Sequence, residues 1–173
     1  MAIEKQSNGA APGGPRFRSV LFICAANTAR SVMAEHILRR ELTARGVEHQ
    51  VRITSAGIAP YARDGALVSL DTRMALRDVG IDLGDEATST ELKRHPELLA
   101  ECDLIIAMTE QQASELVDRF PASRARPVFT LRSFAREAGD IEDPYEKGDQ
   151  VFAECREEIH RLIPIIIARL FED

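Results

Sequence analysis

The alternation of strand-like and helix-like segments predicts a single α/β domain built on a parallel sheet. Short apolar runs rich in Val, Ile, Leu and Phe alternate with longer segments whose apolar residues recur every three or four positions. Strands separated by helices are joined by right-handed crossovers, so the strands lie parallel and helices cover both faces of the sheet. The length of 173 residues fits one domain.

Four segments have the composition and length of buried strands. The first, residues 17–23, is rich in β-favouring residues and ends at Cys24. The other three lie at residues 51–55, 103–108 and 127–130. We therefore expect a four-stranded parallel sheet with Cys24 at the carboxyl end of its first strand, which is the edge where ligands bind in such sheets.

Four further segments have helical periodicity. The first begins at Ser31 and ends near Gly46. The others are residues 66–79, a helix that follows Thr109 with the spacing of a capping box, and a long helix over residues 149–170. Pro164 is expected either to kink or to restart the last helix, because its ring removes an intrahelical hydrogen bond.

Composition excludes several classes of protein. The chain carries 22 Lys and Arg against 28 Asp and Glu, a net charge of −6, so no overall field attracts nucleic acid or an anionic membrane. Cys24, Cys102 and Cys155 form no CxxC pair, which indicates reduced thiols in a cytoplasmic protein and neither a disulfide framework nor a zinc site. The longest apolar tract, residues 162–168, is far shorter than the roughly 20 residues that cross a bilayer.

Residues 1–15 differ in composition from the rest of the chain. Gly, Pro and Ala dominate from residue 9 on, and there is no apolar run of signal-peptide length. We expect a flexible N-terminal extension over residues 1–15 and one folded domain over residues 16–173.

Chemically useful residues are concentrated between the first strand and the first helix, where five small or short polar residues separate Cys24 from Arg30. A tight loop that enters a helix N-terminus turns its backbone N–H groups toward one point, where the helix dipole also favours an anion. Arg30 can add two parallel donors, and Cys24 beneath them is favoured as a thiolate that Ser31 can hydrogen-bond. Asn27 tolerates left-handed backbone. We therefore expect a phosphate-binding loop formed by Ala25, Ala26, Asn27, Thr28, Ala29 and Ser31.

This loop resembles the Cys-x5-Arg-Ser loop of the low-molecular-weight protein tyrosine phosphatases. Because Cys-x5-Arg alone is a common spacing, a structural cysteine before a helix is the alternative. The resemblance extends along most of the chain, in family order, through residues 20–24, 30–35, 55–57, 103–108 and 143–145. It implies an enzyme that hydrolyses phosphotyrosine in proteins through a phosphocysteine intermediate, with no metal or organic cofactor.

The segment Asp143-Pro-Tyr145 is the most specific of these landmarks. The resemblance makes Asp143 the general acid, and the chemistry agrees, because thiolate attack on phosphorus requires a proton for the leaving group. A solvated acidic loop is the alternative. Tyr61 matches one aromatic wall of the family's substrate cleft and Tyr145 would form the other, with ordinary packing as the alternative for both.

Three positions depart from the pattern of many relatives. Ala26 replaces a glycine, so the loop has to avoid a strongly positive φ there or accept strain. Ala29 replaces a second cysteine, which removes a neighbouring thiol that could protect the nucleophile from oxidation. Thr28 stands where tyrosine-directed relatives often have a branched aliphatic residue and where the resembling protein arginine phosphatases have Thr. Its hydroxyl could bind a phosphoguanidinium or only the loop backbone.

The favoured function is hydrolysis of phosphotyrosine in a phosphorylated protein by Cys24, Arg30 and Asp143. One alternative is phosphoarginine hydrolysis at the same site. Another is a thiol-linked arsenate reductase, for which Cys102 and Cys155 are poorly placed. A phosphate-binding module without catalysis is the third, but it has no use for a nucleophile, an arginine and an acid together.

Overall fold

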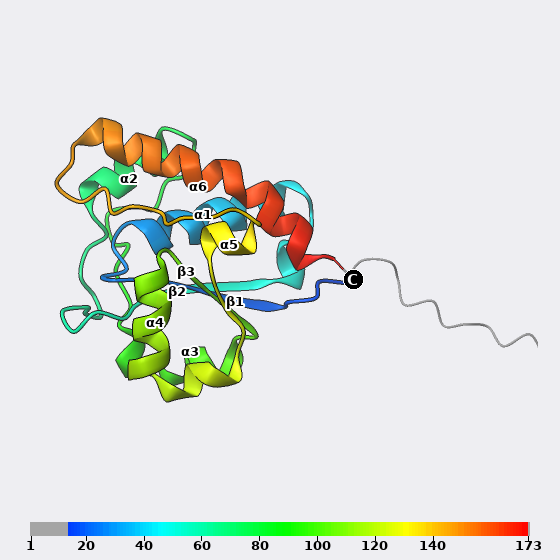
Figure 1. The fold of residues 1–173 in the computed structure, drawn as a ribbon. Coiled ribbons are helices and arrows are strands. Elements are labelled where there is room, and N and C mark those ends of the chain that lie inside the picture. Colours follow the sequence, from blue (N-terminus) through cyan, green and yellow to red (C-terminus); the bar gives the residue numbers. More distant parts are fainter. Residues whose placement is uncertain (1–13, 173) are drawn as a thin grey trace, which may run out of the picture.

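The computed structural model describes residues 14–172 and has the expected α/β architecture (Figure 1). All neighbouring strands of its sheet are parallel, in the order β2-β1-β3-β4. The strands are β1 (Ser19–Cys24), β2 (Arg52–Gly57), β3 (Leu104–Ala107) and β4 (Val128–Thr130). The predicted fold class is therefore confirmed. The predicted N-terminal extension lies outside the described residues, except for Gly14 and Pro15.

Helices cover both faces of the sheet, as Figure 1 shows. One face carries α1 (Arg30–Ala44), α2 (Leu70–Arg77), α5 (Leu131–Phe134) and α6 (Asp149–Leu170), and the other carries α3 (Pro96–Glu101) and α4 (Glu110–Arg119). Three short 3-10 helices lie at Glu48–Gln50, Leu92–Arg94 and Pro121–Ala125. The two layers bury alternate residues of β1, since Phe22 belongs to the first core and Ile23 to the second.

The order of the strands reverses at β1. The chain leaves β1 to form β2 on one side and later forms β3 on the other side, so β1 lies between them. Connections that diverge in this way leave a crevice at the carboxyl end of the strand, where doubly wound sheets bind their ligands. Cys24 is the last residue of β1, and it therefore lies at this crevice.

The predicted helix over residues 66–79 is wrong in its first turn. α2 begins only at Leu70, because Ser69 is its N-cap and accepts a hydrogen bond from Thr72 N at 3.2 Å. The residues before Ser69 pair instead with residues 87–89, where Val68 N donates to the Ala87 carbonyl at 3.0 Å. A short apolar run fits a strand as well as a helix, and here the distant pairing decides.

The remaining helices follow the prediction more closely. Thr109 is the N-cap of α4 and accepts from Gln112 N at 3.1 Å, but Gln112 does not close the capping box, because its Oε1 accepts from Met108 N instead. α6 continues through Pro164, so of the two alternatives for this residue the restart is excluded. α3 and α5 were not predicted, because with 6 and 4 residues they are too short to show helical periodicity.

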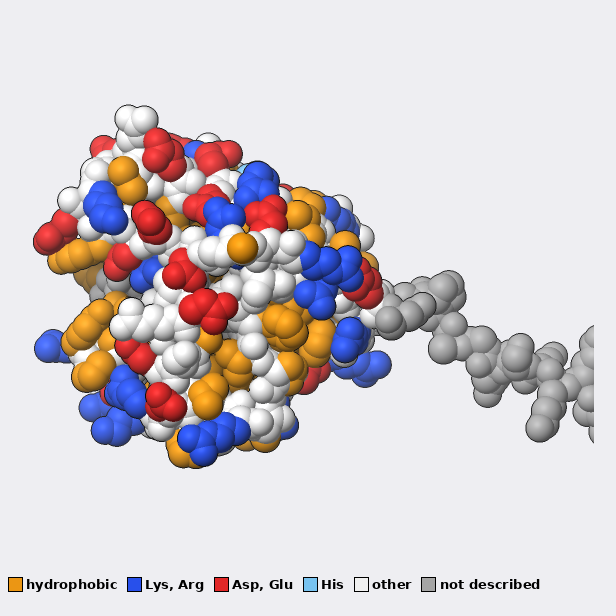
Figure 2. Space-filling view, viewed as in Figure 1, with side chains coloured by type: hydrophobic (Ala, Val, Ile, Leu, Met, Phe, Trp, Pro, Cys, Tyr) orange, Lys and Arg blue, Asp and Glu red, His pale blue; other side chains and the backbone are white. Residues whose placement is uncertain are grey.

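Acidic and basic side chains are interspersed over the face of the molecule drawn in Figure 2. This distribution agrees with the modest net charge of −6 and shows no large field of one sign on that face. An anionic ligand would therefore depend on local donors for its binding.

Candidate functional site

The loop after β1 leads into an N-terminus of α1 that no side chain caps. Ala29 is the N-cap residue, and the first turn of the helix contains no acidic residue. Among the described residues, the backbone N–H groups of Ala25, Ala26 and residues 28–31 have no hydrogen-bond acceptor. Unpaired N–H groups at a helix N-terminus form an anion-binding site, because their partial positive charges add to the helix dipole.

Asn27 holds the loop in shape from beneath. Its side chain is buried, and Nδ2 donates to Ser31 Oγ and to Ser55 Oγ, both at 2.8 Å. Its Oδ1 accepts from Thr90 N at 2.9 Å, so one amide joins the loop to α1, to β2 and to the segment before α3. The loop also avoids strain at Ala26, because its positive φ of 58° falls at Asn27, a residue that tolerates it.

Cys24 lies buried at the bottom of the loop. Its Sγ is 2.9 Å from Ser31 Oγ and 3.3 Å from Asn27 N. Because Ser31 Oγ already accepts a hydrogen bond from Asn27 Nδ2, its own proton is free to be donated to the sulfur. The Asn27 N–H donates to the sulfur and the Ser31 hydroxyl can donate to it, and these two contacts fix its position below the unpaired N–H groups of the loop.

Arg30 connects this loop to the segment between α5 and α6. Its buried guanidinium donates from Nη1 to the Ile141 carbonyl at 2.9 Å, and its Nη2 lies 3.5 Å from Asp143 Oδ2. The Asp143 carboxylate is half exposed and also accepts from Tyr145 N at 3.0 Å. Since a guanidinium has five N–H donors, Arg30 keeps donors for an anion in the loop.

One cavity of about 330 Å³ brings these groups together. It is lined by Cys24, Ala25, Ala26, Thr28, Ala29, Arg30, Tyr61, Ser69, Asp143, Tyr145 and Phe152. Of the predicted loop residues, only Asn27 and Ser31 are not among the lining residues. Both predicted wall tyrosines line the cavity. Ser69 and Phe152 were missed, because a helix N-cap and an apolar residue of an amphipathic helix carry no sequence signal of a ligand site.

Thr28 lines the cavity and also fastens the loop to α2. Its carbonyl accepts from Ser69 N at 3.2 Å and from Thr72 Oγ1 at 2.9 Å. Its side-chain hydroxyl has no hydrogen-bond partner within residues 14–172. The alternative in which this hydroxyl only bonds the loop backbone is therefore not what the structure shows.

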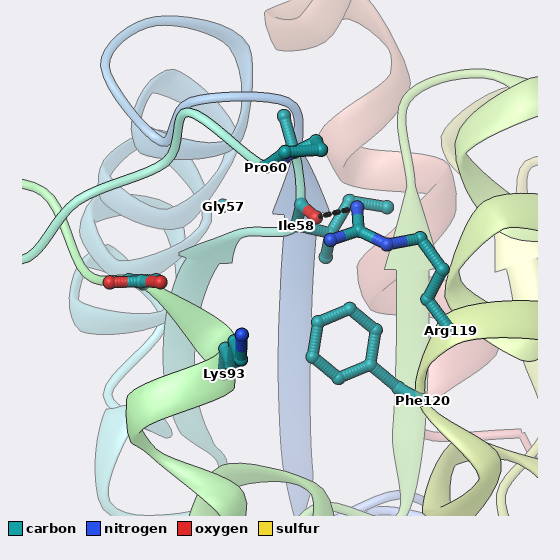
Figure 3. Close-up of a pocket in the computed structure, with 8 residues that line it drawn as sticks. Gly57, Ile58, Pro60, Lys93, Arg119 and Phe120 are labelled. Atoms are coloured by element: carbon teal, nitrogen blue, oxygen red, sulfur yellow. Dashed lines mark hydrogen bonds between the residues drawn. The ribbon is translucent and has the colours of Figure 1, made fainter.

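The end of β2 supports the loop from behind. Gly57 approaches so closely that a Cβ there would lie 2.8 Å from the Ala25 carbonyl oxygen, which excludes any side chain. The next residue, Ile58, donates from its N to the Cys24 carbonyl at 3.0 Å. Figure 3 shows Arg119 of α4 reaching Ile58 across a small cavity of about 120 Å³, and its Nη1 donates to the Ile58 carbonyl at 2.5 Å. In the sequence, Gly57 stood out only as part of the resemblance, and Arg119 carried no signal of a role at the site.

The other two cysteines lie outside the loop that holds Cys24. Cys102 precedes β3 at the amino end of the sheet, and the pairing of Val20 with Leu104 puts it about six strand residues, or roughly 20 Å, from the level of Cys24. Burial raises the pKa of Cys102 to about 11. Cys155 lies in α6 with its Sγ 3.9 Å from the Glu142 carbonyl, and burial raises its pKa to about 12.

Two negative observations apply to residues 14–172. Within this range, no three His, Cys, Asp or Glu side chains are grouped so that they could hold a metal ion. No helix in the same range is long and apolar enough to cross a membrane.

The fold and the site together define an α/β protein in which unpaired backbone N–H groups surround a buried cysteine at the carboxyl end of the sheet. Residues 19–173 match the family model described as low molecular weight phosphotyrosine protein phosphatase, and the chain belongs to that family. The resemblance seen in the sequence is thereby confirmed.

Curated relatives and solved structures agree with this assignment. The chain is 32% identical over 152 residues to a protein-arginine-phosphatase of Geobacillus stearothermophilus, which covers 87% of this chain and 95% of the relative. It is 27% identical over 139 residues to the low molecular weight protein-tyrosine-phosphatase Ptp of Acinetobacter johnsonii, and the match covers 80% of this chain and 88% of the relative. Among solved structures, the low molecular weight protein tyrosine phosphatase from T. tengcongensis superposes with a TM-score of 0.79 at 32% identity, covering 88% of this chain and 99% of that one. The YwlE arginine phosphatase from G. stearothermophilus superposes with a TM-score of 0.77 at 30% identity, and the match covers 88% of this chain and 92% of that one.

Proposed function

We propose that this chain is a cysteine-dependent protein phosphatase, a phosphoric monoester hydrolase that acts through a phosphocysteine intermediate. One observation carries the proposal: Cys24 lies beneath a cradle of unpaired N–H groups in the cavity that also contains Arg30 and Asp143. We assign the catalytic domain to residues 16–173, which the family match over residues 19–173 supports. The three free cysteines support a reducing, cytoplasmic location.

In the first step, the Cys24 thiolate attacks phosphorus in line with the leaving group. The S–P bond forms as the bond from phosphorus to the leaving atom breaks, and Asp143 donates its proton to that atom. The loop N–H groups and Arg30 stabilise the charge on the three equatorial oxygens. A bound dianion competes with Asp143 for the Arg30 guanidinium, which releases the carboxyl group to face the leaving atom.

In the second step, water hydrolyses the phosphocysteine. Asp143, now ionised, accepts a proton from the water as its oxygen attacks phosphorus and the S–P bond breaks. Negative charge returns to Cys24 Sγ, where the Ser31 hydroxyl at 2.9 Å can donate a hydrogen bond to it. The products are inorganic phosphate and the free thiolate.

Phosphotyrosine is the first candidate substrate. Tyr61 and Tyr145 line the cavity and expose 66% and 65% of their surface, so both rings can pack against a phenyl ring in the cleft. The family match and the relative named as a protein-tyrosine-phosphatase support this candidate.

Phosphoarginine is the second candidate, and the free hydroxyl of Thr28 favours it. The N–H groups of a phosphoguanidinium can donate hydrogen bonds to this hydroxyl oxygen, whereas a phenyl ring has no such donor. The relatives named as arginine phosphatases support this candidate. Turnover of matched phosphotyrosine and phosphoarginine peptides decides between the two. Thr28→Val, which removes the hydroxyl at similar volume, should lower kcat/KM for phosphoarginine about tenfold and leave phosphotyrosine unchanged. Equal effects on both substrates would exclude Thr28 as the selecting residue.

A thiol-linked arsenate reductase is not favoured, because its relay needs further cysteines that can reach the nucleophile. Cys102 is separated from Cys24 by roughly 20 Å along the sheet, whereas the Cα atoms of a disulfide lie within about 7 Å. The relay needs two cysteines besides the nucleophile, and Cys155 alone cannot supply both.

Substitution of the nucleophile tests the proposed function. Cys24→Ser should abolish turnover and leave vanadate binding largely intact, since the cradle is made of backbone groups. Mass spectrometry of acid-quenched wild-type protein should find phosphate on Cys24. Cys102→Ala serves as the control for removal of a buried thiol and should keep full turnover. Turnover near the wild-type rate in Cys24→Ser would refute the mechanism.

A further inference from the structure

Five large apolar or aromatic side chains are strongly exposed among the described residues, and all of them belong to two segments that border the catalytic cavity. They are Tyr61, Leu67, Leu70, Met74 and Tyr145. Exposed apolar residues of soluble proteins are usually scattered, whereas a contiguous patch marks an interaction site. The two tyrosines line the cavity itself. The other three form what we call the apolar rim: Leu67, Leu70 and Met74.

The apolar rim is attached to the wall of the cavity through Ser69. Ser69 lines the cavity, caps α2 and donates from its N to the Thr28 carbonyl of the phosphate-binding loop. Leu70 follows directly as the first residue of α2, and Met74 lies four residues on, over the same face of the helix. Leu70 and Met74 therefore extend from the cavity wall along the solvent side of α2, and Leu67 lies two residues before Ser69.

Packing within the domain does not account for the rim. α2 already buries Thr72, Ala75 and Leu76 on its other face. Leu70 is 64% exposed and Met74 is 47% exposed, at positions where an amphipathic surface helix normally has polar residues. Their exposed apolar surface contributes no hydrophobic free energy until another molecule covers it.

We propose that the apolar rim binds apolar side chains of the phosphoprotein substrate close to its phosphorylated residue. This inference rests on the proposed phosphatase function. The five residue steps from Ser69 to Met74 rise about 7.5 Å along the helix, and an extended peptide advances roughly 3.3 Å per residue. The rim is therefore within reach of substrate residues about two to four positions from the phosphorylated one.

The continuity of rim and cleft favours substrate over a second copy of the chain. Because Ser69 lines the cavity and Leu70 follows it directly, a partner that stayed on the rim would lie beside the cleft that a phosphoprotein has to enter. A substrate segment covers the rim only while its phosphorylated residue occupies the cleft, so binding and turnover remain compatible.

The test compares a small ester with phosphopeptides. p-Nitrophenyl phosphate fits the cleft without reaching the rim, and the peptides carry either Leu or Ser at positions two to four residues from the phosphorylated residue. The series uses phosphotyrosine or phosphoarginine, whichever the wild-type enzyme hydrolyses. We expect wild-type kcat/KM to be about tenfold higher for the Leu peptides, in line with burial of one or two apolar side chains.

Two glutamine variants should remove this preference. Leu70→Gln and Met74→Gln keep good helix propensity and similar size, so each should reduce the Leu-to-Ser ratio toward one and leave kcat/KM for p-nitrophenyl phosphate unchanged. Arg77→Gln, on the following turn of the same helix, is the matched control and should keep the preference. Its exposed side chain only approaches Asp82 at 3.7 Å.

Equal kcat/KM for the Leu and Ser peptides overturns the inference, and so does a preference that survives both glutamine variants. Sedimentation is the second deciding measurement. A wild-type dimer that becomes monomeric in Leu70→Gln, with no change in peptide preference, assigns the rim to a second copy of the chain and also overturns the inference. Absence of any turnover of the small ester refutes the proposed function itself, and this result is visible before any peptide is compared.

Discussion

Replacing Asn27 by alanine should both destabilise the fold and disorder the loop between Cys24 and Ser31. The substitution removes the amide that donates to Ser31 and Ser55 and accepts from Thr90 N. It also puts a Cβ-bearing residue without a polar side chain at a φ of 58°. Because the side chain of Asn27 is buried, water cannot easily replace the lost hydrogen bonds.

The expected loss follows from these contacts. A neutral hydrogen bond contributes about 0.5–1.5 kcal/mol, so three of them account for about 1.5–4.5 kcal/mol. Left-handed backbone costs alanine about 1 kcal/mol more than it costs glycine. We therefore expect the free energy of unfolding to fall by about 2.5–5.5 kcal/mol in Asn27→Ala and by about 1 kcal/mol less in Asn27→Gly.

Urea unfolding of the two variants measures this difference directly. Turnover of p-nitrophenyl phosphate should fall in both, since the Ser31 hydroxyl loses the donor that orients it toward Cys24. Gln150→Ala, at an exposed position of α6, is the control for removal of a side-chain amide and should leave both measurements unchanged. A loss below about 1 kcal/mol in Asn27→Ala, or equal stability of the alanine and glycine variants, would refute this reasoning.

Three further predictions concern the acid, the thiols and a surface histidine. Asp143→Asn should lower turnover of a phenyl phosphate with a poor leaving group by about 100-fold and that of an activated ester much less; equal losses would remove Asp143 from the role of acid. Peroxide should inactivate the enzyme with poor recovery by dithiothreitol, because Ala29 supplies no thiol and the pKa of about 12 keeps Cys155 protonated. Phosphate should slow this inactivation, and a Cys24–Cys155 disulfide found by mass spectrometry with full recovery would contradict it. Hydrogen bonds to Glu97 and Asp64 raise the pKa of His95, so its stabilising effect is fully present below the unfolded pKa of about 6.5 and is lost as the pH rises through the folded value. His95→Gln should therefore lower the melting temperature more at pH 5.5 than at pH 9, and an equal effect at both would contradict the assignment.

Much of the fold could be predicted from the sequence because its signals are local. A buried parallel strand is a continuous apolar run, and β1 and β3 were found on that basis. α1 and α6 show the three-to-four residue spacing of amphipathic helices over 15 and 22 residues. The start of α2 could not be found in this way, because residues 66–68 bond to residues 87–89 and no local pattern encodes that pairing.

In the candidate site too, local sequence signals predicted some features and contacts between distant segments decided the others. The sequence by itself determined the Cys24 to Ser31 loop and its place between strand and helix, and it indicated Asp143 and the wall tyrosines through the resemblance. Only the tertiary structure decided what holds these groups together: the Ile141 carbonyl that anchors Arg30, the Thr28 carbonyl bound by α2, and the Thr90 N–H that meets Asn27. These partners are backbone groups, which almost every residue possesses. Their identity as partners therefore depends on where the fold places them and not on which amino acids carry them.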